Sequence, residues 1–307
     1  MYFWILAIAA VLVVWFGIAV HEIGHALACR RAGIPVREIS LLGFPLPGIK
    51  GWQLPFKSRT FPETIFLIHP VLLGAYMKPD NVAMEAAGRR ERVRILAMGP
   101  IASLLFGLTL LTLCSLAFAA DTIVGGCTKC LQKGAVNNQP WTIGMFVAIG
   151  CATLSVTILI LLLRRYFWFH IALLVVGIAL LPLMAYVIYT LLMDVLFSTK
   201  PLHEILTGMF GTVRVSRDWI LAMHDDQSPT LMRGIGSVAI VAGGLSLFIG
   251  LANLVPMFAG DGTMIIMEYV PERLGKLIWT VTLAVMGLFM LLVLVGDAAD
   301  ILHFVRG

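Results

Sequence analysis

Residues 2–20 read YFWILAIAAVLVVWFGIAV, and His21-Glu22-Ile23-Gly24-His25 follows directly. The first stretch has no charged side chain, so as a helix rising about 1.5 Å per residue it crosses the roughly 30 Å hydrocarbon layer of a membrane. In the same helix His21 and His25 lie about one turn apart and face the same way, so both imidazoles can share one metal ion. Glu22 lies about 100° round the helix, which predicts a general base that takes a proton from water.

The depth of this motif decides between two interpretations. Ionisable groups at membrane depth are costly and are by default functional, which favours a metal site. The alternative is a polar cluster that caps a helix in the membrane interface. Because a catalytic zinc site normally has three protein ligands, the metal interpretation requires one more acid or His at the same depth.

The composition is that of a polytopic membrane protein. Of the 307 residues 60% are hydrophobic and 13% are charged, and the mean hydropathy is +0.95, whereas soluble domains carry about 25% charged residues. We therefore predict an α-helical polytopic membrane protein with about six transmembrane helices, forming a single membrane-embedded domain over residues 1–307. The apolar runs are 2–27, 95–119, 142–163, 168–193, 235–256 and 277–296.

Basic residues predict the orientation of these helices. The segment between the first two runs holds about half of the 22 Lys and Arg residues, which makes it cytoplasmic by the positive-inside rule. Six spans then place both termini outside, and Arg164-Arg165 falls inside, as the rule requires. The net charge of +5 is thus a topology signal, and we expect no nucleic-acid partner. Because the first run lacks a basic flank and a small-residue cleavage site, it is not a removable signal peptide.

Residues 34–93 depart from the helical pattern. Seven prolines between 35 and 79 exclude a long helix, and short apolar pieces at 41–44 and 65–68 predict short strands. We expect a small hairpin-like sheet on the cytoplasmic side that dips into the membrane, shielded from lipid by protein. Farther on, residues 142–193 would form an extra transmembrane hairpin. Residues 194–232 would be extracytoplasmic, with an amphipathic helix at about 202–213 that is more simply a surface helix than a gate.

The cysteines fall into two groups. Cys29, Cys114 and Cys151 lie in or beside apolar helices, where a free thiol packs as a small hydrophobe. Cys127 and Cys130 lie in a polar stretch that we predict to be an outside loop, which favours a local disulfide over an incidental pair or a redox or metal role. Two thiolates without a nearby His leave a zinc site two ligands short.

Asp261 is the best candidate for the third metal ligand. It follows the apolar run 235–256, and Pro256, Gly260 and Gly262 should break the helix there and let the carboxylate turn inward. The predicted topology puts it on the same side of the membrane as the His pair. Taken alone, the segment favours a solvated Asp in an Asp-Gly turn, but beside two His a ligand is the better interpretation.

Three motifs resemble the site-2 protease family of intramembrane metalloproteases. They are residues 21–25 at the end of a span, Ala97-Met98-Gly99-Pro100-Ile101-Ala102-Ser103 at the start of the second span, and Asn253, Pro256, Asp261 and Gly262 at the spacing of the family's Asn-Pro-Asp-Gly motif. Gly74-Ala75-Tyr76-Met77-Lys78 is similar to part of the membrane-associated β-loop in bacterial members that cleave anti-sigma factors.

The chain also departs from that family's pattern. Bacterial members often carry a PDZ domain between the two motif-bearing spans, where this chain has residues 142–232 instead, so substrate filtering by a PDZ domain is not implied. Around the aspartate, Phe258, Gly260 and Thr263 stand where the family pattern has Pro, Leu and Gly.

The resemblance implies a zinc metalloprotease that hydrolyses peptide bonds within or near transmembrane segments, in regulated intramembrane proteolysis. It makes His21, His25 and Asp261 the ligands of Zn²⁺, Glu22 the general base, and Asn253 a residue that holds the substrate backbone. The implied partners are the lipid bilayer and a transmembrane protein, such as an anti-sigma factor or a signal-peptide remnant. The implied location is a bacterial inner membrane, with the active site toward the cytoplasm.

Two rival functions remain, a divalent-metal transporter and a catalytically inactive membrane scaffold. A transporter needs a polar path to the other face of the membrane, and polar side chains are scarce in the apolar runs. Glu22 argues against both rivals, because neither a transport site nor a structural site needs a carboxylate that binds no metal.

Overall fold

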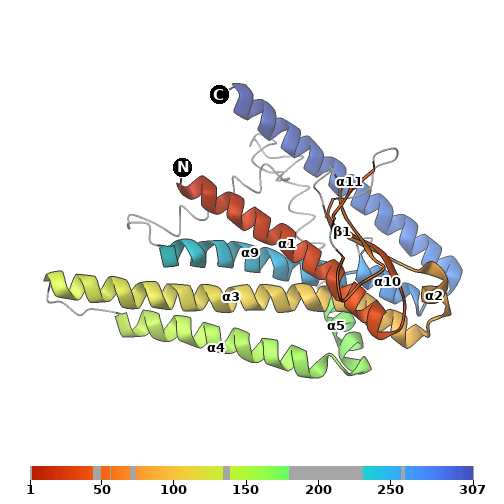
Figure 1. The fold of residues 1–307 in the computed structure, drawn as a ribbon, viewed down its shortest axis with the longest axis horizontal. Coiled ribbons are helices and arrows are strands. Elements are labelled where there is room, and N and C mark those ends of the chain that lie inside the picture. Colours follow the sequence, from red (N-terminus) through yellow and green to blue (C-terminus); the bar gives the residue numbers. More distant parts are fainter. Residues whose placement is uncertain are drawn as a thin grey trace. The chain divides into compact units, whose positions relative to one another are not determined.

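The computed structural model describes residues 2–43, 50–55, 57–69, 74–133, 139–179, 231–256 and 260–306; the side chains of 2–4, 119, 121–133, 139–148, 233, 289–290 and 292–306 are excepted. Most of them are helical, and four short strands follow the first helix (Figure 1). The helices are α1 (Tyr2–Arg31), α2 (Asn81–Ala86), α3 (Arg89–Lys133), α4 (Gln139–Leu163), α5 (Phe167–Ala179), α9 (Leu231–Leu254), α10 (Asp261–Met267) and α11 (Glu272–Arg306).

Three helices in the described part of the chain are long and apolar enough to cross a membrane. They comprise Ile5–Arg31 in α1, Arg89–Phe118 in α3 and Gly234–Leu254 in α9, and they correspond to the first, second and fifth predicted spans. The apolar parts of α4 and α5 are shorter, at Ile149–Leu163 and Phe167–Ala179. The sixth predicted span falls inside α11. An integral membrane protein is therefore supported, and the number six stays a prediction.

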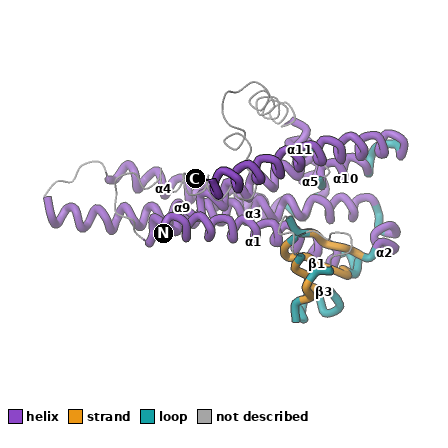
Figure 2. Tube along the Cα trace, turned by 90° about the horizontal axis from the view of Figure 1, so that it is seen from above, coloured by secondary structure: helices purple, strands orange, loops and turns teal. Residues whose placement is uncertain are grey.

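The strands form one small mixed sheet in the order β2-β3-β1-β4. Figure 2 shows the strands of this sheet in orange. Strand β1 (Val36–Leu42) runs parallel to β3 (Ile65–Ile68) and antiparallel to β4 (Tyr76–Pro79), and β2 (Trp52–Gln53) is antiparallel to β3. The predicted hairpin-like arrangement is therefore wrong at its centre. Parallel neighbours cannot be joined by a tight turn, so the chain crosses over between β1 and β3.

The chain divides into two compact units. Unit 1 comprises Met1–Val14, Leu104–Leu163 and Val213–Leu247, and unit 2 comprises Trp15–Ser103, Arg164–Thr212 and Phe248–Gly307. In unit 1, Ala10 and Val241 are buried against each other, and the hydroxyls of Thr112 and Thr153 link α3 to α4 at 2.8 Å. Unit 2 has a larger core in which one face of the sheet packs on the end of α1 and the start of α3; its buried members include Ala26, Cys29, Ile39, Phe66 and Ile95.

One further prediction is wrong. The stretch around Cys127 and Cys130 is not a loop, because α3 continues through both residues to Lys133. Their side chains lie outside the described set, so the disulfide stays a prediction. The expected amphipathic helix at 202–213, residues 180–193 of the predicted hairpin and the position of Phe258 also lie outside the described residues.

Candidate metal centre

The two His of the motif meet at one point inside unit 2. Because they are four residues apart in α1, their rings lie on one face of the helix, with centroids 4.9 Å apart and Nε2 atoms 3.2 Å apart. Both are buried, at 5% exposure for His21 and 6% for His25. Two nitrogens with lone pairs at this distance repel each other unless a proton or a cation lies between them.

Asp261 completes this group from 236 residues farther along the chain than His25. Its Oδ2 lies 3.0 Å from His21 Nε2, and its Oδ1 lies 3.3 Å from His25 Nε2. Helix α9 ends at Leu254 and α10 begins at Asp261, so the expected break in the helix is observed. The turn is tight: a Cβ on Gly262 would lie 2.2 Å from the Leu254 carbonyl oxygen, so only glycine fits there.

The other ring nitrogens of the two His are held by α3. His25 Nδ1–H donates to the Ile95 carbonyl at 2.7 Å, and His21 Nδ1 hydrogen-bonds Ser103 Oγ at 2.9 Å. Since a carbonyl only accepts, the Ile95 bond fixes the proton of neutral His25 on Nδ1 and leaves the Nε2 lone pair directed at Asp261. Partners of this kind orient metal-ligating His in known metal sites and raise their basicity.

Gly99 provides the space in which the donor atoms meet. A Cβ at this position would lie 2.2 Å from His25 Nε2 and 2.7 Å from His21 Nε2. Any side chain on Gly99 would therefore occupy the region between the two nitrogens. Gly99, about three turns into α3, thus has a steric role that the sequence alone did not reveal.

Glu22 lies beside the three donor atoms. It is partly exposed, lies within electrostatic range of His21, His25 and Asp261, and faces the backbone N–H of Met77 in β4. The sheet therefore reaches the edge of the site.

Asn253 occupies the last turn of α9, close to the residue before Asp261. Its Nδ2 donates to the Ile249 carbonyl at 3.0 Å, and a Cβ on Gly260 would lie 2.9 Å from its Oδ1. Asn253 is thus packed against the loop that carries the aspartate.

The donor set fits a zinc ion. His21, His25 and Asp261 each offer one ligand atom, and these atoms lie within 4.8 Å of one another. Two imidazoles and one carboxylate are a known ligand set for catalytic zinc. The room left by Gly99 and the fixed Nδ1 atoms supply the cavity and the orientation that such a site needs.

Comparison with known proteins identifies the class. Residues 9–295 match the model of peptidase family M50, the site-2 protease family. The chain therefore belongs to this family of intramembrane metalloproteases. A comparison with curated proteins found no significant match.

Sequence reasoning named the three donors and Glu22, and the structure brings all four together. The sequence did not predict Ser103 and Ile95 as partners of the two His, nor Met77 beside Glu22. Ile95 and Met77 act through backbone atoms, which leave no trace in residue type. Ser103 falls one turn after Gly99 in the Gly-Pro segment, and that spacing was the only available signal.

Proposed function

We propose that this chain is a zinc endopeptidase that cleaves membrane proteins within or near their transmembrane segments. The observation that carries the proposal is the convergence of three donor atoms within 4.8 Å, with the Glu22 carboxylate beside them. The location of His21 and His25 inside an apolar helix supports a reaction at membrane depth. The family supplies the reaction class.

In this proposal each residue has one task. His21, His25 and Asp261 hold zinc, which when bound acts as a Lewis acid that polarises the scissile carbonyl and activates water. Glu22 accepts the proton of the attacking water and delivers it to the leaving amine. The Ile95 carbonyl keeps His25 in the ligating tautomer, and Ser103 holds the ring of His21 through its hydrogen bond to Nδ1. Asn253 contacts the substrate backbone through its side-chain amide.

The free edge of β4 is the proposed binding site for the substrate backbone. The Asp80 N–H donates to the Pro35 carbonyl, and the Gly74 carbonyl accepts from the Gly43 N–H. Even-numbered residues of β4 therefore direct their backbone N–H and C=O groups toward β1. The odd-numbered residues then face away from β1, and Met77 N–H contacts Glu22 on that side. A helical substrate hides its peptide bonds and must unwind before water can attack. An unwound segment can add as a strand to this edge, which brings it next to Glu22.

The partners and the location are part of the same proposal. The substrate class is a transmembrane protein, for example an anti-sigma factor or a signal-peptide remnant, and the membrane is a bacterial inner membrane. Both termini are outside and the active site faces the cytoplasm, as the distribution of Lys and Arg favours. Such cleavage would be a step of regulated intramembrane proteolysis.

The test compares membrane peptides in cells that express wild-type protein or Glu22→Gln, together with the zinc content of both purified proteins. We expect Glu22→Gln to retain zinc and lose about 10²- to 10⁴-fold in cleavage, because general-base catalysis contributes that much. Asp261→Ala should lose zinc as well as activity, because two ligands remain.

Other outcomes separate the rivals. Zinc loss in Glu22→Gln would mean that Glu22 is a ligand. Zinc flux into liposomes without cleavage would favour the transporter, and neither flux nor cleavage would favour the scaffold.

A further inference from the structure

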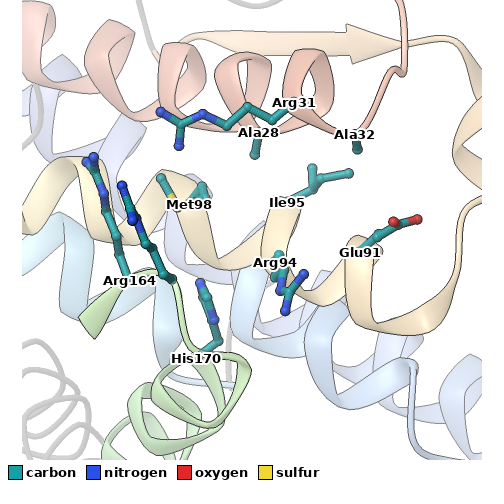
Figure 3. A pocket seen from close by; sticks show the side chains of 10 residues that line it. Ala28, Arg31, Ala32, Glu91, Arg94, Ile95, Met98, Arg164 and His170 are labelled. Atoms are coloured by element: carbon teal, nitrogen blue, oxygen red, sulfur yellow. The ribbon is translucent and has the colours of Figure 1, made fainter. Parts of the chain in front are cut away.

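A cavity of about 500 Å³ lies in unit 2 apart from the metal donors (Figure 3). Its walls come from the end of α1, the first turns of α3, and the turn between α4 and α5 with the start of α5. Figure 3 shows the Arg31, Arg164 and His170 side chains directed into this space. Its charged and titratable lining residues are Arg31, Glu91, Arg94, Arg164, Arg165 and His170.

The positive charge of this cavity is poorly neutralised. Four guanidinium groups and one carboxylate line it. Within the described residues none of the four Arg forms an ion pair, in contrast to Arg92, which is paired with Glu268 at 2.7 Å. Glu91 Oε2 instead accepts from Gly88 N–H at 3.4 Å. Four guanidiniums that converge on one cavity repel one another, and an anion in the cavity would relieve that repulsion.

His170 adds an unsatisfied polar group to the same cavity. It is 1% exposed, and neither ring nitrogen has a hydrogen-bond partner among the described residues. The carbonyls of Tyr166 and Phe167 lie near the ring without hydrogen-bond geometry. A buried polar atom without a partner is costly, so a ligand that accepts a hydrogen bond from the imidazole N–H would stabilise the site.

The cavity lies where apolar segments end. Arg31 is the last residue of the α1 span, Arg94 lies near the start of the α3 span, and Arg164 follows the apolar stretch that ends at Leu163. Tyr166 and Trp168 beside it are 64% and 77% exposed. Exposed Tyr and Trp are enriched at the level of the lipid headgroups, which places the cavity at that depth.

We propose that this cavity, which we call the arginine pocket, binds a phosphate-bearing anion through Arg164, Arg165, Arg31 and His170. Guanidinium forks match phosphate oxygens, and the imidazole supplies one further donor. The phosphodiester headgroup of an anionic lipid and free phosphate share this chemistry. The aromatic residues and the helix ends favour the lipid, because basic pockets between membrane helices bind such headgroups. The inference does not rest on the proposed protease activity.

The arginine pocket also adjoins the metal centre. Ile95 lines the pocket, and its carbonyl accepts the His25 Nδ1–H bond. Met98 lines it as well, and its carbonyl oxygen would lie 2.6 Å from a Cβ on Gly24. A bound anion would therefore rest against the same turn of α3 that orients His25.

The test measures ligand binding by native mass spectrometry of the full chain in detergent. The probes are phosphatidylglycerol, phosphatidylcholine and inorganic phosphate. The pocket variant is Arg164→Gln with Arg165→Gln. The matched control is Arg30→Gln with Arg59→Gln, which makes the same charge change at exposed residues that do not line the pocket. His170→Phe is a third variant that retains a ring and removes the donor, and zinc content checks the fold of each.

We expect wild-type protein to bind phosphatidylglycerol more tightly than phosphatidylcholine, and the pocket variant to lose at least about tenfold of that affinity. The control should stay within about twofold, and His170→Phe should weaken binding without any change in charge at the surface. Binding of inorganic phosphate that is lost in the pocket variant, with no preference between the lipids, would identify free phosphate as the ligand. Equal losses in variant and control, or no binding of either phosphate probe, would overturn the proposal. If the pocket variant fails to fold, unchanged lipid and phosphate binding by His170→Phe would overturn the proposal.

Discussion

At the scale of single residues, the metal centre depends on a glycine at position 99. Gly99 has no Cβ, and one placed there would lie 2.2 Å from His25 Nε2. The imidazole cannot swing aside without cost, because its Nδ1–H bond to the Ile95 carbonyl holds the ring from the other end. The site therefore needs glycine for space.

This requirement predicts the effect of Gly99→Ala. The added methyl should push the imidazoles apart and lower zinc affinity at least as much as the loss of an outer hydrogen-bond partner, about 10- to 100-fold. Zinc titration of the purified protein measures it. Gly244→Ala is the control, because a Cβ there meets nothing within 4 Å, and it should bind zinc as wild type does. Wild-type zinc affinity in Gly99→Ala would show that the rings move freely.

At the scale of elements, β4 combines two functions on its two edges. One edge completes the sheet through β1, and the other faces Glu22 through Met77 N–H. Pro79 agrees with this division, because it has no N–H and occupies an odd position that faces away from β1. The sheet therefore presents a backbone edge to the metal centre.

A pair of proline substitutions should separate the two edges. Met77→Pro deletes the outer-edge N–H that faces Glu22, so zinc content should persist while kcat/KM falls about fivefold or more, because the general base loses one backbone contact of about 1 kcal/mol. Lys78→Pro deletes a donor directed at β1 and should lower stability and zinc content together. Cleavage and zinc assays on both variants decide the matter. Unimpaired cleavage by Met77→Pro would contradict a role of this edge of β4 in the reaction.

The Arg92–Glu268 pair fastens α10 to the start of α3. Its two nitrogens lie 2.8 and 2.7 Å from the two carboxylate oxygens, and the two side chains are 27% and 18% exposed. Glu268 is the C-cap of the same short helix that Asp261 begins. The pair therefore helps to keep the third donor in place.

We expect Glu268→Gln to destabilise the protein by about 1–3 kcal/mol and to speed zinc release, because charged hydrogen bonds of this kind contribute that much. Thermal unfolding and zinc dissociation rates measure the two effects. Glu272→Gln is the control, because its pair with Lys276 is exposed and should contribute less than about 0.5 kcal/mol. Equal effects in the two variants would contradict the role of the Arg92 pair.

At the scale of the whole molecule, the orientation in the membrane remains a prediction from charge. Lys57 lies in the basic segment and is exposed. In a protein without other cysteines, Lys57→Cys should react with an impermeant maleimide only after the cytoplasmic face is opened. In the wild type, Cys127 and Cys130 should react in intact cells, and only after reduction if they form a disulfide. Labelling of Lys57→Cys in intact cells would show that the predicted orientation is inverted.

The sequence by itself determined the membrane class, the His pair, Glu22 and the break before Asp261. Each of these follows from local rules: run length against membrane thickness, the helical period of the motif, and the helix-breaking residues around 256–262. The strand-rich character of residues 34–93 also followed from the prolines.

Only the tertiary structure decided which distant groups meet. The parallel pairing of β1 with β3, the Ile95 carbonyl on His25, the space above Gly99 and the contact of Met77 with Glu22 all join segments far apart in the chain. Backbone atoms and an absent side chain carry most of these contacts. Neither backbone contacts nor the space left by a glycine can be read from residue type. The sequence could therefore predict the metal donors, whereas the groups that hold them in place were visible only in the structure.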